Sequence, residues 1–158
     1  MTNTKSNLHD EARTALAALP QGARLLGLDL GTKTIGLATS DLRRQIATPR
    51  ETIQRQKFQA DAALLLSFAT QEEIGLMVMG FPLNMDGSEG PRCQSARAFV
   101  RNLAKLTMIP IVFWDERLST VAVTRVMLEA DMSRAKRAAN VDKLAAAYIL
   151  QSFLDSSR

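Results

Sequence analysis

The chain has 158 residues, of which 46% are hydrophobic and 23% charged, and its formal net charge is +4. These values predict one soluble globular domain with a buried core. No run of about 20 apolar residues is present, so no membrane span is expected. Charged residues stand near the N-terminus where the apolar part of a signal peptide would lie, so we expect a cytoplasmic protein.

The counts of cysteine and histidine restrict the chemistry further. The chain has one cysteine, Cys93, and one histidine, His9. One cysteine excludes an internal disulfide, and these counts are too low for a conventional zinc site. Because His9 lies in the polar N-terminal extension, a Ser-His-Asp triad is not expected. An enzyme built from this chain therefore has to use carboxylates, hydroxyls, lysines or a metal. The positive net charge is compatible with a polyanionic partner without proving one.

The hydrophobic pattern predicts the elements in chain order. A short helix over 7–19 is expected to end at Pro20 and Gly22. Strands are predicted over 24–30, 34–40 and 47–54, then a helix over 58–70 and a strand over 74–79. A helix over 92–106, a strand over 109–114, a helix from 119 to about 130, a basic loop over 132–140 and a helix over 141–154 follow.

This order of elements predicts an α/β fold. Three strands joined by tight turns, followed by alternating helices and strands, give a mixed sheet with helices on both faces. The first strand is expected at the centre of the sheet, beside the later parallel strands. We treat residues 1–22 as an N-terminal extension and 23–158 as one domain. Ligands of such sheets bind beyond the carboxyl ends of the strands.

Asp29 stands near the end of the first predicted strand, within LLGLDLGTKTIGLATSD (25–41). Its carboxylate could bind a metal, or the glycines and Thr32 of the following turn could hold a nucleotide phosphate. A strand and turn without function is the third interpretation. Acidic residues are depleted from strands and are rarely buried unless paired, which favours a functional role for Asp29.

Other acids also stand near the ends of predicted elements. Asp115 and Glu116 directly follow the last buried strand, and Asp142 stands in the first turn of the last predicted helix. Taken singly, the first two could form a surface ion cluster, and Asp142 could be a helix-start acid. Because adjacent strand residues point to opposite faces, only one of Asp115 and Glu116 can face Asp29, and we choose Glu116.

Asp29, Glu116 and Asp142 can converge on one point beside the sheet. Three carboxylates that lie close together repel one another and need a cation. Oxygen ligands without histidine or thiolate point to Mg²⁺ or Mn²⁺. Ions held in this way activate water and stabilise the leaving oxygen in phosphodiester hydrolysis.

Four segments resemble the YqgF/RuvX family, nucleases of precursor 16S rRNA related to Holliday-junction resolvases in the RNase H-like superfamily. The segments are LGLDLGTKTIGLATSD, VMGFPLNMDGSEGP, VFWDERLSTVAV and NVDKLAAAYILQSFL, which together span roughly residues 25–154. The resemblance implies an RNase H-like mixed five-stranded sheet. It also implies that Asp29, Glu116 and Asp142 are the catalytic, metal-binding acids of a nuclease that trims the 5′ end of precursor 16S rRNA.

Basic residues near the expected cleft could hold the phosphates of structured RNA. They are Lys33 in the first turn, Arg97, Arg117 beside Glu116, and Arg134, Lys136 and Arg137 in the basic loop. Each could equally be a solvated surface residue.

Other functions stay open at this point. One alternative is a resolvase-like endonuclease that cuts branched DNA, for which a symmetric cut requires a homodimer. An actin-like or sugar-kinase-like nucleotide-binding protein is less favoured, because such proteins need a second glycine-rich site. A non-catalytic RNA-binding module would not require the three acids.

Overall fold

The computed structural model describes residues 4–118 and 134–157. In chain order its elements are α1 (Thr4–Ala17), β1 (Arg24–Leu30), β2 (Thr34–Ser40), β3 (Ala47–Gln54), α2 (Phe58–Gln71), β4 (Ile74–Phe81), α3 (Pro91–Leu103), β5 (Ile111–Asp115), the 3-10 turn η1 (Glu116–Leu118) and α5 (Arg134–Ser156). Among the described helices, none is long and apolar enough to cross a membrane.

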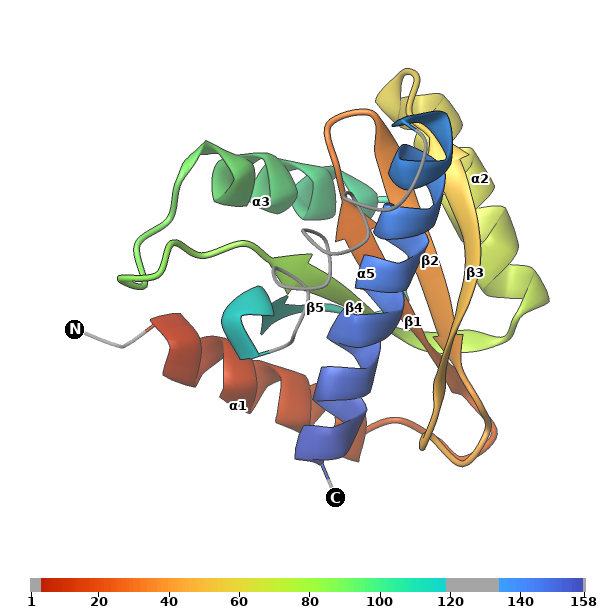
Figure 1. Cartoon of the computed structure of the whole chain (residues 1–158). Helices are drawn as coiled ribbons and strands as arrows, with labels where there is room; N and C mark the ends of the chain where they lie inside the picture. Colours follow the sequence, from red (N-terminus) through yellow and green to blue (C-terminus); the bar gives the residue numbers. More distant parts are fainter. Residues whose placement is uncertain (1–3, 119–133, 158) are drawn as a thin grey trace.

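The strands form one five-stranded sheet in the order β3-β2-β1-β4-β5 (Figure 1). β2 pairs antiparallel with β1 and with β3, whereas β4 pairs parallel with β1 and with β5. The central position of β1 and the change from antiparallel to parallel pairing confirm the predicted mixed sheet. The carboxyl ends of the parallel strands β1, β4 and β5 lie at the same end of the sheet, and ligands of such folds bind there.

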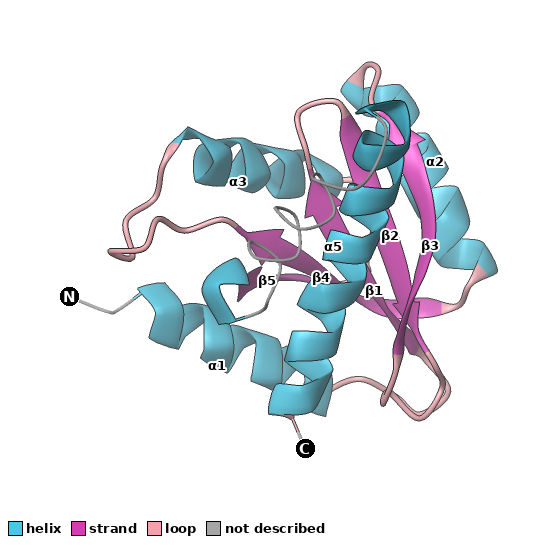
Figure 2. Ribbon diagram, viewed as in Figure 1, coloured by secondary structure: helices cyan, strands magenta, loops and turns pink. Residues whose placement is uncertain are grey.

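Alternation along β1 directs its side chains into two separate cores. Leu26 and Leu28 belong to the core on the side of α2 and α3. Leu25 belongs to the core on the side of α5. Helices therefore cover both faces of the sheet, with α5 on one side and α2 and α3 on the other (Figure 2).

The N-terminal helix α1 packs beside β5 at the edge of the sheet (Figure 1). Leu8 and Ala12 of this helix are buried, and the ring of His9 lies 5.1 Å from the ring of Trp114 on β5. An uncovered edge strand presents unpaired backbone groups to other chains. The position of α1 beside β5 therefore covers this edge strand and limits its pairing with other chains.

The last helix begins earlier than the sequence predicts. α5 starts at Arg134 rather than at residue 141, so the predicted basic loop over 132–140 is wrong from residue 134 onward. The segment RAKRAAN consists mainly of alanine, arginine and lysine, which favour helix, and it contains no glycine or proline to interrupt one. The helix predicted from 119 to about 130 lies outside the described residues.

Candidate active site

Asp29 projects from β1 toward α5. Gly27 lies two residues earlier and therefore on the same face of the strand. A Cβ atom built on Gly27 would lie 2.8 Å from the carbonyl oxygen of Ala146 and 2.8 Å from Cβ of Leu150, both on α5. The Asp29 side chain is fully buried under this helix. Burying a carboxylate is costly unless other groups stabilise its charge, so this position demands an explanation.

The strand neighbours of Asp29 are both glycines. Asp29 pairs with Gly36 of β2, and Gly80 of β4 lies one residue beyond the pair formed by Leu28 and Met79. A glycine within a strand often marks a site where another group approaches the backbone closely. The missing side chain of Gly80 therefore leaves space over β4, next to the Asp29 carboxylate.

Glu116 enters the space above Gly80. It is the first residue of η1, directly after β5, and it is half-buried. A Cβ atom built on Gly80 would lie 2.6 Å from Oε1 of Glu116 and 2.4 Å from Cδ1 of Ile149 on α5. The Glu116 carboxylate thus lies on the α5 face of the sheet, over the strand that neighbours Asp29.

The direction of α5 determines where Asp142 stands. The backbone N–H of Ala47 on β3, which is level with the start of β1 across β2, donates to Oε1 of Gln151 over 2.9 Å, so α5 runs antiparallel to β1 (Figure 1). Gly27 and Ala146 are in contact. Asp142 lies four residues before Ala146, about 6 Å along the helix axis. Asp29 lies two residues after Gly27, about 6.6 Å along β1 and in the same direction. The turn of α5 that carries Asp142 therefore lies alongside Asp29.

The helix position of Asp142 also corrects one sequence interpretation. Because α5 begins at Arg134, Asp142 stands two turns inside the helix and not in its first turn. A helix-start role therefore does not explain this acid. Its side chain lies outside the described part of the structure, and within the described part no group of three metal-binding side chains is found.

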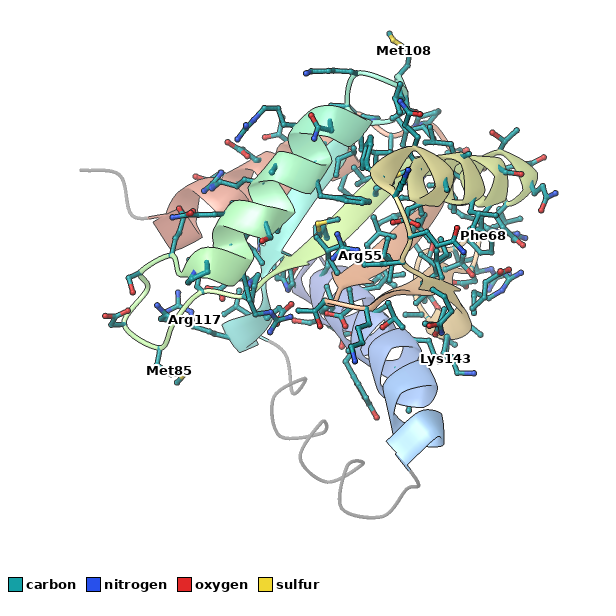
Figure 3. All side chains as sticks on the ribbon, turned by 90° about the horizontal axis from the view of Figure 1, so that it is seen from above. Arg55, Phe68, Met85, Met108, Arg117 and Lys143 are labelled. Carbon is teal, nitrogen blue, oxygen red and sulfur yellow. The ribbon has the colours of Figure 1, made fainter. Side chains whose placement is uncertain are left out.

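Asp115 faces the other side of the sheet. It pairs with Phe81, which belongs to the core beneath α2 and α3, and its side chain is buried. Arg117 donates to both of its carboxylate oxygens, from Nε to Oδ1 over 3.0 Å and from Nη2 to Oδ2 over 2.8 Å. Nη1 of Arg117 donates to the carbonyls of Asn84 and Met85. Figure 3 labels Arg117 and Met85 in this part of the structure. Asp115 thus holds Arg117, and Arg117 attaches the loop after β4 to the end of β5.

Arg97 supports the same loop. Its Nε and Nη2 donate to Glu89 over 2.7 and 2.9 Å, and its guanidinium lies 4.7 Å from the centre of the Phe81 ring. The hydrogen bonds from Arg97 lower the pKa of Glu89, and the same pair raises the pKa of Arg97. Arg97 and Arg117 thus have structural partners, and their predicted contacts with nucleic acid stay predictions.

The other predicted phosphate contacts lie nearer the carboxyl end of β1. Lys33 is exposed in the turn between β1 and β2. Arg134, Lys136 and Arg137 stand in the first turn of α5 and not in a loop, which corrects the sequence prediction. Because α5 runs antiparallel to β1, its first turn lies toward the same end of the sheet as Asp29.

A family model described as "RuvX: Holliday junction resolvase" matches residues 23–156. The chain belongs to the RuvX family. This confirms the family predicted from the four segments. Proteins named "Putative pre-16S rRNA nuclease" are similar over most of their length. The relative from Paramagnetospirillum magneticum is 62% identical and aligns over 89% of this chain and 91% of its own. The relative from a Ruegeria strain is 56% identical over 96% of both chains.

Solved structures show the fold of this RuvX family member. Thermus thermophilus RuvC in complex with a Holliday junction substrate has a TM-score of 0.54 and 14% identity, over 85% of this chain and 95% of that one. A second T. thermophilus RuvC structure gives a TM-score of 0.52 at 13% identity, over 84% of this chain and 95% of that one. These likenesses confirm the predicted RNase H-like fold.

Two residues near the carboxyl end of β1, Gly80 and Arg55, were not identified as candidates from the sequence. The predicted strand over 74–79 stops before Gly80, whereas β4 continues through it to Phe81. A glycine that ends an apolar strand is the signal that could have identified it. Arg55 follows β3 and donates from Nη1 to the carbonyl of Gly31 over 2.6 Å. Nothing in the hydrophobic pattern marks Arg55.

We expect Glu116→Gln to reduce cleavage far more than Asp115→Asn. Glu116 lies over Gly80 on the Asp29 side of the sheet, whereas Asp115 bonds to Arg117 on the other side. Asp115→Asn weakens this pair and lowers stability by about 1–3 kcal/mol. The measurement is cleavage at several Mn²⁺ concentrations together with thermal unfolding. A greater loss of cleavage in a folded Asp115→Asn protein, not restored by Mn²⁺, would reverse the assignment.

Proposed function

We propose that this RuvX family member is a metal-dependent nuclease that hydrolyses phosphodiester bonds of structured RNA in the cytoplasm, in maturation of the 5′ end of precursor 16S rRNA. The observation that carries the proposal is the buried Asp29 carboxylate with Glu116 over the neighbouring strand. The antiparallel course of α5 supports Asp142 as the third acid. The names of relatives that are 56–62% identical support the RNA substrate.

A divalent cation fits the residues of this site. The absent side chain of Gly80 leaves the space that Oε1 of Glu116 enters. Carboxylate oxygens are the ligands that Mg²⁺ and Mn²⁺ prefer. We therefore assign Asp29, Glu116 and Asp142 as the residues that hold the ion. When bound, such an ion supplies Lewis-acid stabilisation of the charge that develops on the phosphate oxygens.

The residues of the chain position the substrate and transfer the proton. Asp29 is buried beneath α5, so its carboxylate is held in one orientation at the end of β1. Gly31 in the following turn allows a sugar-phosphate backbone to approach closely. The single histidine, His9, precedes the family match at 23–156. We therefore assign proton transfer from the attacking water to a carboxylate, and no covalent intermediate with the chain forms.

Basic residues at the same end of the sheet support binding of a polyanion. Lys33 is exposed in the β1–β2 turn. Arg134, Lys136 and Arg137 stand in the first turn of α5, which contains no acidic residue. Positive charge at a helix N-terminus opposes the helix dipole and costs about 0.3–1 kcal/mol for each residue. A bound phosphate backbone offsets this cost, and such contacts position a strand without reading its sequence.

Replacing Arg134, Lys136 and Arg137 together with alanine is expected to weaken nucleic-acid binding. The slope of log K against log salt should fall by about 2, since each lost contact with a single strand removes about 0.7. Metal binding and thermal stability should not decrease, because the substitutions relieve repulsion with the helix dipole. Binding titrations at several salt concentrations check this, with Arg101→Ala, Lys105→Ala as the control. An unchanged slope and affinity would identify the run as solvated surface.

A resolvase-like activity on branched DNA is the second candidate, because the matching family model is described as a Holliday junction resolvase. A symmetric cut of a four-way junction requires a homodimer. The test is incubation of purified protein with labelled precursor 16S rRNA and with a labelled junction, each with Mg²⁺ or Mn²⁺. Cleavage of the rRNA at the 5′ side and an intact junction would support the proposal. Symmetric junction cleavage with intact rRNA would favour the resolvase, and no cleavage of either would contradict both.

A further inference from the structure

A basic hollow lies at the carboxyl end of β1, on the opposite face of the strand from Asp29. It is a cavity of about 240 Å³. Gly31 and Thr32 of the β1–β2 turn line it, with Arg55 after β3 and with Arg92 and Ser95 of α3. No acidic side chain of the described residues lines this cavity. Its two arginines therefore give it a positive potential that favours an anion.

Arg55 is held in place by the β1–β2 turn. Its backbone N–H donates to the carbonyl of Lys33 over 2.8 Å, and Nη1 donates to the carbonyl of Gly31 over 2.6 Å. Figure 3 shows Arg55 between α2 and α3. A guanidinium has five N–H donors, so this contact leaves further donors for a ligand. Its fixed position reduces the entropy lost when it binds an anion.

Arg55 and Arg92 differ from the arginines that stabilise the fold. The ion pairs found among the described residues occupy Arg24, Arg50, Arg97 and Arg117 with the acids Glu72, Glu89 and Asp115. Within the part of the chain that the structure describes, neither Arg55 nor Arg92 forms an ion pair. Arg92 is exposed on the first turn of α3. Two like charges that share a cavity repel each other, and a bound anion removes this repulsion.

We infer that this cavity binds a backbone phosphate of the nucleic-acid substrate, close to the phosphate that is cleaved. The inference rests on the proposed nuclease function and adds a phosphate subsite to it. Gly31 is two residues after Asp29, a separation of at most about 7 Å along the chain. A strand that crosses the end of β1 therefore reaches Asp29 on one face and the cavity on the other. The hydroxyls of Thr32 and Ser95 supply further donors to phosphate oxygens.

The test is binding of a single-stranded RNA oligonucleotide by the full chain with Mg²⁺, in an Asp29→Asn background that prevents cleavage. Arg92→Ala is expected to lower the slope of log K against log salt by about 0.7. The affinity should fall about fourfold at 0.15 M salt and about eightfold at 0.05 M salt. Arg101→Ala removes the same charge from the last turn of the same helix and should leave binding unchanged.

Arg92→Lys should restore the slope, because it keeps the charge. Arg55→Lys is the second variant, since Arg55→Ala would also remove the bond to Gly31, and it should weaken binding because lysine lacks the guanidinium fork. The same slope and affinity for Arg92→Ala as for Arg101→Ala, with parent-like binding by Arg55→Lys, would overturn the phosphate subsite while leaving the nuclease proposal intact. Absence of RNA binding by both the wild-type protein and the Asp29→Asn parent would overturn both the subsite and the proposed RNA nuclease.

Discussion

Replacing Asp29 with asparagine is expected to give a folded protein that cleaves its substrate more than 100-fold more slowly. Asparagine keeps the shape of the buried side chain but removes the charge that we assign to metal binding. Loss of a group that only supports a metal ligand commonly costs about 10–100-fold, so loss of a ligand should cost more. Thermal stability should be unchanged or higher, because a buried charge has been removed. Cleavage assays with Mn²⁺ and thermal unfolding measure the two effects.

Asp61→Asn is the matched control for this variant. Asp61 of α2 is also a buried acid, but its Oδ1 accepts a hydrogen bond from the backbone N–H of Gln56 over 2.9 Å. The substitution should lower stability by about 1 kcal/mol and leave cleavage unchanged. Wild-type cleavage by a folded Asp29→Asn protein would contradict the assignment of Asp29.

Gly80→Ala is expected to reduce cleavage by about 100-fold while lowering stability only slightly. The new Cβ would lie 2.6 Å from Oε1 of Glu116 and 2.4 Å from Cδ1 of Ile149. Both atoms end flexible side chains, so the fold can adjust at a cost of about 1 kcal/mol. Glu116 has to move aside, and a displacement of about 1 Å in an active site can cost about 100-fold in rate.

Gly27→Ala should have the opposite profile. Its Cβ would meet the backbone carbonyl of Ala146 and Cβ of Leu150, each at 2.8 Å. Neither atom can rotate away, so α5 has to shift and the free energy of unfolding should fall by about 1–3 kcal/mol. Comparison of unfolding and cleavage for the two alanine variants separates the site from the packing. Full activity of Gly80→Ala with high Mn²⁺ affinity would mean that Glu116 has no role at the site.

The elements with a simple local pattern were predictable from the sequence. β2 and β3 begin and end where the sequence predicts. The start of α5 was not predictable in the same way. Charged and small residues over 134–140 are compatible with a solvated loop, and only their intrinsic helix preference distinguishes the two. Its earlier start changes the interpretation of Asp142, which is no longer a helix-start acid.

Strand alternation predicts that only one of Asp115 and Glu116 faces Asp29. In the structure Asp115 ends β5 whereas Glu116 begins η1, so the turn after the strand also contributes to their opposite orientations. Partner choice does not follow from such local rules. Arg97 bonds to Glu89, eight residues away, because the loop after β4 folds back onto α3. The contact between Gly80 and Glu116 joins β4 to the residue that follows β5. Such a contact between segments distant in the sequence cannot be read from the order of residues.

Calorimetric titration of Mn²⁺ into the wild-type protein, Asp29→Asn and Glu116→Gln tests the metal site most directly, with ATP titrated separately. We predict that wild-type protein binds Mn²⁺, that each substitution removes or strongly weakens this binding, and that ATP produces no binding heat. Equal Mn²⁺ binding by all three proteins would contradict the assigned ligands. ATP binding in place of Mn²⁺ binding would contradict the nuclease proposal and favour a nucleotide-binding protein.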